Sequence, residues 1–387
     1  MDSIRYSTQD IDENDIRSVV ELLKSDFLTQ GPIGAEFEQA VAGFCGSEYA
    51  ISVSSATAGL HIAYKALGLG PGGLVWTTPL TFVATANAAL YCGAMVDFVD
   101  TDPLTFNMCP EALAAKLEQA DKAGELPKIV SPVHLGGQSC DMKRIKELSK
   151  KYGFKIVEDA SHAFGADYEG QKLGNCSYSD LCIFSLHPVK MITTGEGGLV
   201  LTQDSELARK CQLLRSHGVT RNNDEMDSDQ DGRPWYYEQI LLGFNYRLSD
   251  IQAALGLTQL SRLTKFVEKR RSIALTYDQN LDRDLYVPQS QIASSVSSYH
   301  LYLVKVRNTH LRDDLFSHLK KRKIMANLHY IPVYRHPYFQ RHCPTNPGIY
   351  PNSEDYYAKA LSIPVHTKMS ESDQDRVLEA MNDFTMA

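Results

Sequence analysis

The sequence predicts an α/β fold, with a mostly parallel sheet covered by helices followed by a smaller α+β domain. Between residues 49 and 202, short apolar segments with strand character alternate with segments of helical periodicity. This alternation is typical of a parallel sheet with helices on both faces. From residue 251 onwards, one long helical pattern replaces it. A chain of 387 residues has room for about two to three domains. We therefore expect a large domain of residues 1–250 and a small domain of residues 251–387.

The expected elements of the large domain follow one another as strand, helix, strand. Two helical patterns come first, and serine caps and glycine stops mark several of the later helix ends. We expect helices at 11–27, 36–46, 55–70, 81–93 and 141–153. We expect strands at 49–55, 74–79, 94–100, 128–135, 154–159, 180–186 and 198–202. Ligands of such sheets bind at the carboxyl ends of the strands.

The small domain is expected to begin with a long helix at 251–281. A strand at 299–306 and a helix at 313–323 follow, and then a stretch rich in Pro, Tyr and His. The segment 222–234 is acidic and contains Gly and Pro, so we interpret it as a mobile surface loop.

Composition excludes several classes of function. The net charge of −8 argues against nucleic-acid and anionic-membrane partners, because both require a basic surface. The eight cysteines are scattered, with no zinc-like spacing, so we expect reduced thiols, a cytoplasmic protein and no metal. We find neither a signal-peptide pattern nor an apolar run of about 18 residues.

Four motifs carry residue types suited to chemistry. Small residues in SSATAGLHIA (54–63) open a helix after a strand, where free N–H groups can bind an anion, although for this motif alone an ordinary capped turn is the simpler explanation. Asp159 in VEDASHAFG ends a strand and could face a ligand or cap a helix, and His162 follows it. Phe82 could cover a flat ligand or pack in the core. Lys190 follows Ser185 in FSLHPVK and is either a solvated residue or a reactive amine.

Together these motifs match what pyridoxal 5′-phosphate (PLP) requires of a protein. The cofactor needs a lysine to hold it and donors for its phosphate. It also needs a carboxylate that keeps its pyridine nitrogen protonated, so that the ring can accept electrons.

The chain resembles the DegT/DnrJ/EryC1/StrS family of sugar aminotransferases from about Tyr6 to its C-terminus. The matching segments are LTQGPIGAEFEQ, SSATAGLHIA, GLGPG, VEDASHAFGA, FSLHPVK, ITTGEGG, LLRSHG and GFNYRLSDIQAALG. The resemblance implies the type I PLP-dependent aminotransferase fold and a homodimer with shared active sites. A plain dinucleotide-binding protein is excluded, because SSATAG lacks the G-x-G-x-x-G pattern.

The resemblance also implies roles for individual residues. Lys190 would be the Schiff-base lysine, with Asp159 at the pyridine nitrogen. His162 would lie near the ring hydroxyl, where many members have glutamine. Phe82 would stack on the ring. Thr57, Ala58 and Ser185 would bind the phosphate, together with Asn245 of the neighbouring subunit. Asn245 could otherwise be a helix cap.

Within the family, the chain is most similar to members that aminate C4 of a UDP-linked 4-keto-6-deoxy-N-acetylhexosamine in pseudaminic acid biosynthesis. The shared segments are HPVK (187–190), SSYHLYLV (297–304) and HYIPVYRHPYF (329–339), with departures at Leu186 and Met191. The similarity implies that the sugar site also contains Ser185 and Asn245, along with Tyr6, Asp26, Phe27, Leu28, Thr29, Ala56, His329, Tyr330, Ile331 and Pro332. Plain aromatic–proline packing is an alternative explanation of the 329–332 segment.

The expected reaction takes the amino group from L-glutamate, with the Lys190 amine as general base. No arginine can be assigned to the donor's carboxylate. Amination of a 3-keto or D-xylo 4-keto nucleotide sugar is the nearest alternative. A 3-dehydratase of this family would have histidine in place of Lys190. A non-catalytic PLP-binding regulator would have a DNA-binding segment, and we find none.

Overall fold

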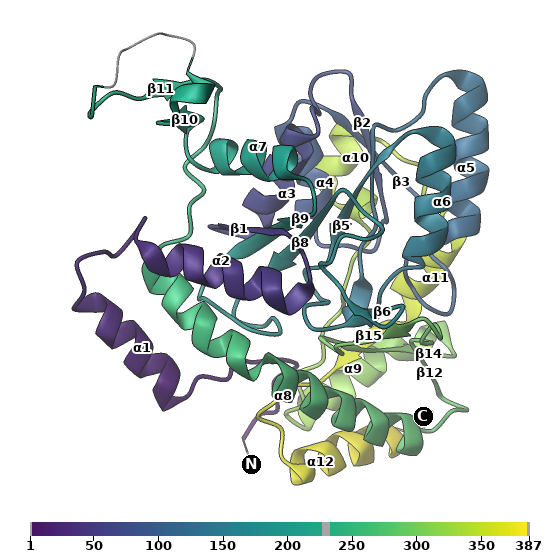
Figure 1. The fold of residues 1–387 in the computed structure, drawn as a ribbon. Helices are drawn as coiled ribbons and strands as arrows, with labels where there is room; N and C mark the ends of the chain where they lie inside the picture. Colours follow the sequence, from purple (N-terminus) through teal and green to yellow (C-terminus); the bar gives the residue numbers. More distant parts are fainter. Residues whose placement is uncertain (1, 227–232, 385–387) are drawn as a thin grey trace.

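A central seven-stranded sheet organises the larger part of the computed structural model, which describes residues 2–226 and 233–384 (Figure 1). Its strand order is β1-β9-β8-β5-β4-β2-β3. The strands are β1 (Tyr49–Val53), β2 (Leu74–Thr77), β3 (Met95–Phe98), β4 (Ile129–Ser131), β5 (Lys155–Asp159), β8 (Leu181–Ser185) and β9 (Gly198–Thr202). All neighbouring pairs are parallel except β1–β9 and β8–β9, where β9 is antiparallel to both neighbours. The predicted mostly parallel sheet is confirmed.

Helices cover both faces of this sheet because alternate strand residues are apolar on each side. Ile129, Val157 and Ile183 pack in one hydrophobic cluster. That cluster also contains residues of α3 (Ala56–Ala66), α4 (Ala84–Tyr91) and α7 (Ser205–Arg215). Val130, Ile156 and Cys182 face the opposite cluster. The helices on that side are α2 (Pro32–Cys45), α5 (Pro110–Ala123), α6 (Met142–Tyr152) and the first half of α8 (Asp250–Asn280).

A third hydrophobic cluster lies around the antiparallel sheet β12-β14-β15, formed by Tyr286–Pro288, Tyr302–Val306 and Ala360–Ile363. The second half of α8, α9 (Arg312–Lys321) and α12 (Glu371–Asn382) pack on it, and Ile4 joins from the N-terminal segment. The expected boundary between residues 250 and 251 falls at the start of α8. Because α8 contacts two clusters, the domain division stays a prediction.

Smaller elements complete the chain. α1 (Glu13–Leu23) packs along α8, and α10 (Pro337–His342) and α11 (Pro351–Lys359) follow the small sheet's second strand in sequence. The short strands are β6 (Asp167–Tyr168), β7 (Gln171–Lys172), β10 (Val219–Thr220), β11 (Glu238–Gln239) and β13 (Ser295–Val296). Of the expected loop 222–234, residues 227–232 lie outside the described residues.

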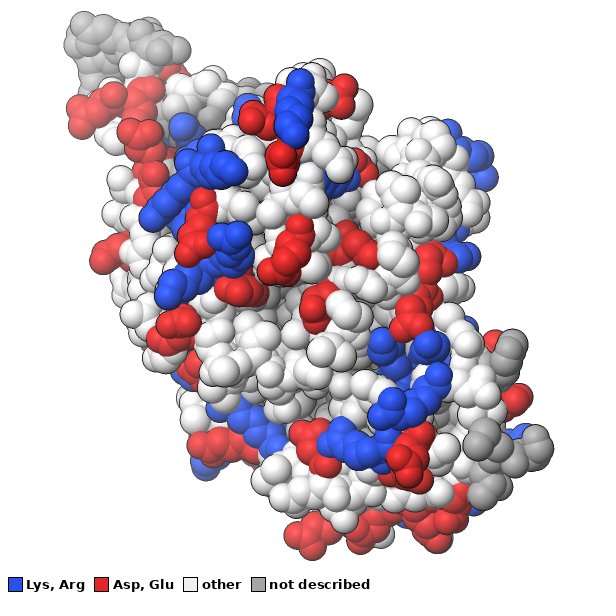
Figure 2. Space-filling model, turned by 90° about the vertical axis from the view of Figure 1, so that its right-hand side faces the viewer, with Lys and Arg blue, Asp and Glu red and all other residues white. Residues whose placement is uncertain are grey.

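The surface carries mixed charge. On the face shown in Figure 2, acidic and basic side chains are intermixed. Within the described residues, no helix is long and apolar enough to cross a membrane. The same residues contain no group of three or more His, Cys, Asp or Glu side chains placed to hold a metal ion.

Candidate active site

One edge of the large sheet brings three strand ends together. Val53 at the end of β1 and Ser185 at the end of β8 both pair in register with Gly198, the first residue of β9. β5 runs parallel to β8 and ends at Asp159. A cavity of about 600 Å³ lies at this edge. Its walls include Tyr6, Ser55, Ala56, Thr57, Phe82, Asp159, Ser161, His162, Ser185, His187, Lys190, Glu196, His300, Asn327, His329 and Tyr330.

Lys190 contributes an amine to this cavity. It lies in the connection between β8 and β9, and its backbone N–H donates to the His187 carbonyl. Across residues 2–226 and 233–384, its Nζ atom has no hydrogen-bond or ion-pair partner. Burial lowers the pKa of Lys190 to about 8, although the carboxylate of Asp159 opposes this shift. About a tenth of the amine is therefore uncharged at pH 7, far more than for an ordinary lysine.

Asp159 is held as a carboxylate acceptor at the end of β5. Its side chain is buried, with 5% exposed. Thr85 Oγ1 donates to Oδ2 at 2.6 Å, and the Ser161 N–H donates to Oδ1 at 3.1 Å. These two donors fix the plane of the carboxylate at the cavity wall.

The first turn of α3 forms one part of the cavity wall. Ser55 is the N-cap residue, and its Oγ accepts the Ala58 N–H at 3.1 Å. The N–H groups of Ala56 and Thr57 belong to the first turn, where helix geometry provides no partner. Gly198 lets this turn approach the sheet, because a Cβ there would lie 2.5 Å from the Ala56 nitrogen. Ser185 adds a hydroxyl to the same cavity.

Three histidines surround the amine in neutral form. Burial lowers the pKa of His162 and of His300 well below the ordinary value, and that of His329 to about 3, and the positive charge of Lys190 adds to each shift. His162 Nε2 lies 2.9 Å from Tyr330 Oη, and its ring centroid is 4.5 Å from that of His300. Neutral imidazoles can donate and accept hydrogen bonds at the same time.

The residues present fit PLP. An unpartnered lysine amine, a buried carboxylate at a strand end and a helix N-terminus line one cavity. Phe82 is 60% exposed and lies at the cavity wall, so its ring is free to cover a flat ligand. Thr57, Ser185, His162, Asp159 and Lys190 would hold the cofactor.

Several residues expected at the site lie outside this cavity. The segment Asp26–Thr29 is exposed and follows α1, and Asn245 is exposed in an isolated bridge with Ser216. Ala58, Ile331 and Pro332 adjoin lining residues without lining the cavity themselves. By contrast, Tyr6, Ala56, His329 and Tyr330 are brought together at its wall.

Sequence reasoning missed Thr85, Ser161 and His300. Thr85 lies three residues after Phe82 on α4, and its hydroxyl gave no motif by itself. Ser161 acts through its backbone N–H, which no side-chain pattern reveals. His300 lies in the apolar segment SSYHLYLV, and a histidine within such a segment could have indicated a residue of the site.

Comparison with known proteins places these features in one family. The model of the DegT/DnrJ/EryC1/StrS aminotransferase family matches residues 9–382. The UDP-4-amino-4,6-dideoxy-N-acetyl-beta-L-altrosamine transaminase of Campylobacter jejuni is 39% identical over 382 residues, covering 98% of this chain and 96% of the relative.

Two solved structures extend the comparison. PseC of Helicobacter pylori, an aminotransferase involved in the biosynthesis of pseudoaminic acid, has a TM-score of 0.89 at 32% identity and covers 99% of this chain and 100% of its own. The PLP form of Spr1654 from Streptococcus pneumoniae has a TM-score of 0.87 at 28% identity, with 98% of both chains covered. The chain therefore belongs to the DegT/DnrJ/EryC1/StrS aminotransferase family: it has the type I fold and is a PLP-dependent sugar aminotransferase.

Proposed function

We propose that this aminotransferase moves the amino group of L-glutamate to C4 of a UDP-linked 4-keto-6-deoxy-N-acetylhexosamine of L-arabino configuration, in the cytoplasmic synthesis of pseudaminic acid. The observation that carries the aminotransfer is the unpartnered Lys190 amine, which shares a cavity with the Asp159 carboxylate. The sugar is supported by the C. jejuni and H. pylori relatives, whose names specify it or its pathway.

Lys190 and Asp159 are the proposed catalytic residues. When bound, PLP supplies a carbonyl that links to an amine and a ring that accepts electrons. The Lys190 amine would be the general base that takes the proton from the donor's α-carbon. Asp159 would place a negative charge beside the pyridine nitrogen and so keep a proton on it.

The remaining cofactor residues bind and orient. The first turn of α3, with Thr57 and Ala58, offers backbone N–H groups to the phosphate, and Ser185 offers its hydroxyl. His162 would donate to the ring hydroxyl from Nε2, the atom that now lies next to Tyr330 Oη. Phe82 would cover one face of the ring and exclude water from it.

The sugar site is proposed to need two copies of the chain. Tyr6, Ala56, His329 and Tyr330 form the part of the site within one chain. The exposed residues Asp26, Phe27, Leu28, Thr29 and Asn245 would serve the cavity of a second copy, with Ile331 and Pro332 at the entrance. An isologous homodimer places each such residue at two equivalent sites.

The substrate is tested by direct comparison of three ketones at equal concentration with glutamate as donor. These are the L-arabino and D-xylo 4-keto UDP sugars and a dTDP 3-keto sugar. We expect the L-arabino sugar to react fastest and a free sugar without the nucleotide to react poorly, because remote binding energy orients the carbonyl. Faster amination of the 3-keto sugar would contradict the C4 assignment, and faster reaction of the D-xylo epimer would contradict the pathway.

A further inference from the structure

We propose that His134 and Glu158, which lie behind the strand end that carries Asp159, are positioning residues for the transamination. They would hold Asp159 and His162 in the orientation that the cofactor ring requires. The inference rests on the proposed roles of Asp159 and His162, and neither His134 nor Glu158 lines the cavity.

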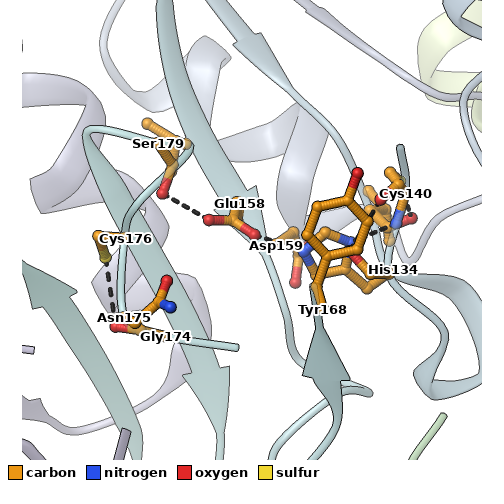
Figure 3. Close-up of polar contacts among 12 residues, drawn as sticks. His134, Cys140, Glu158, Asp159, Tyr168, Gly174, Asn175, Cys176 and Ser179 are labelled. Carbon is orange, nitrogen blue, oxygen red and sulfur yellow. Dashed lines mark hydrogen bonds and ion pairs between the residues drawn. The ribbon is translucent and has the colours of Figure 1, made fainter. Parts of the chain in front are cut away.

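Glu158 and Asp159 point to opposite faces of β5, as successive strand residues do. Asp159 faces the cavity, whereas Glu158 is 3% exposed in the interior. Figure 3 shows the Glu158 carboxylate between Ser179 and His134. Its Oε2 lies 2.7 Å from His134 Nε2, and its Oε1 accepts from Ser179 Oγ at 2.5 Å.

His134 continues the network into the segment 133–140. Its ring is 0% exposed, and Nδ1 accepts the Cys140 N–H at 3.1 Å (Figure 3). His134 thus ties both ends of this segment to β5, since Val133 also forms a bridge with Asp159. Each imidazole nitrogen has a different partner, so the ring has one orientation.

The segment 133–140 contacts both residues that would face the cofactor. The His134 N–H donates to the Asp159 carbonyl at 3.1 Å, and the Asp159 N–H donates to the Pro132 carbonyl at 2.9 Å. The Gly136 N–H donates to His162 Nδ1 at 3.4 Å. Gly137 has a φ of 105°, and a Cβ there would lie 3.0 Å from the His162 carbonyl oxygen. A shift of this segment would therefore move Asp159 and His162 together.

Removing one partner of a buried carboxylate leaves it with an unsatisfied charge, which the structure relieves by moving. Here the part that moves would be the segment 133–140, because Glu158 belongs to β5, which is paired with β8 inside the sheet. A displacement of about 1 Å at a reacting group can cost about 100-fold in rate.

The test uses two substitutions of one residue in the cofactor-loaded enzyme. His134→Gln keeps a donor near the Nε2 position for Glu158. His134→Asn keeps an acceptor near Nδ1 for Cys140 but cannot reach Glu158. We measure cofactor affinity by equilibrium dialysis, the pH midpoint of the cofactor's visible absorption, and kcat and KM for the sugar. Glu158→Gln is the second route if His134→Asn does not fold.

We expect His134→Asn to weaken cofactor binding about 10-fold and to lower kcat about 10- to 100-fold, with a shifted absorption midpoint and a nearly unchanged KM. His134→Gln should stay within about threefold of the wild type, because it retains the donor to Glu158. The cofactor affinity and kcat of Glu158→Gln should lie between those of the two His134 variants.

The matched control is Tyr286→Phe. Tyr286 is buried around the small sheet, and its hydroxyl donates to the Met381 carbonyl at 2.8 Å. The Tyr286→Phe substitution should lower the midpoint of thermal unfolding while leaving cofactor affinity, the absorption midpoint and kcat unchanged. The proposal is overturned if His134→Asn binds cofactor and turns over normally, or if Tyr286→Phe shows the same losses. Cofactor affinity and absorption do not involve the sugar, so an error in the sugar assignment would leave these results unaffected.

Discussion

The cofactor end of the cavity is formed by one chain, whereas the surface segments expected to complete the site lie away from that cavity. Around Lys190, the carboxylate, the helix N-terminus and the histidines all come from one chain and lie within one cavity. The segment Asp26–Thr29 and Asn245 are exposed and contact no part of that cavity. Cofactor chemistry can thus be assembled by one fold, whereas substrate binding would depend on a second copy.

Replacing Lys190 should have the largest effect in the cofactor region. Lys190→Ala should lower kcat by about 10³-fold or more, because it removes the general base and the covalent attachment. Dialysis should still find PLP bound, since the helix N-terminus and Asp159 remain. Turnover within tenfold of the wild type would contradict the assignment.

Asp159→Asn should lower turnover by about 10²-fold. A neutral amide keeps the Thr85 hydrogen bond but cannot hold a proton on the pyridine nitrogen. Thermal unfolding should change little relative to Thr85→Val, a control that removes the supporting hydroxyl and keeps the charge. If Asp159→Asn has normal kinetics, Asp159 serves only to organise the turn at Ser161.

Mixing two inactive variants tests whether the exposed region completes a neighbouring cavity. Lys190→Ala and Asn245→Asp chains, each nearly inactive, should give about a quarter of the wild-type activity after 1:1 subunit exchange. Half of the dimers would be mixed, and each mixed dimer would contain one intact site. Confirmed exchange without recovery would show that Asn245 acts in its own chain, and an active Asn245→Asp chain would show that it has no role in the site.

Phe82→Ala should weaken PLP binding by about 3- to 10-fold, which corresponds to the loss of one stacking contact. Phe82 is mostly exposed, so folding should be unaffected. Tyr338→Ala, a change at another half-exposed ring that does not line the cavity, is the control. Equal affinities for the wild type and Phe82→Ala would mean that the ring does not cover the cofactor.

The smallest effect concerns the pH dependence of Lys190. Burial lowers its pKa to about 8, so the uncharged amine should increase as pH rises through 8. Acylation of Lys190 in cofactor-free protein, followed by peptide mass spectrometry, should show this midpoint, well below that of an ordinary lysine at about 10.4. The Asp159 carboxylate raises the pKa, so Asp159→Asn should move the midpoint lower; a move to higher pH would contradict the proposed contact.

Local patterns predicted much of the fold. The strands ending at Asp159 and Ser185 are short, apolar and bounded by turns, so their sequence indicates both their presence and their ends. The antiparallel direction of β9 was not predicted, because the connection that carries Lys190 gives no directional signal. α5 and α7 were also missed, although both are regular helices.

The site was predictable where one residue carries the chemistry by itself. Lys190, Asp159 and His162 stand in motifs and do lie together. Thr85 and His134 contact Asp159 and Glu158, which lie 74 and 24 residues away in the chain. Such pairs arise from strand order and register, which local patterns do not encode. The proposed role of Asn245 requires a second chain, which patterns within one sequence do not describe.

The most direct test of the account is to reduce the PLP-loaded enzyme with borohydride and to map the labelled peptide by mass spectrometry. Reduction makes the bond between cofactor and lysine permanent, so the label records which amine holds the cofactor. The account predicts a single labelled residue, Lys190, in the peptide that contains FSLHPVK. A label on any other lysine, with Lys190 unmodified, would contradict it.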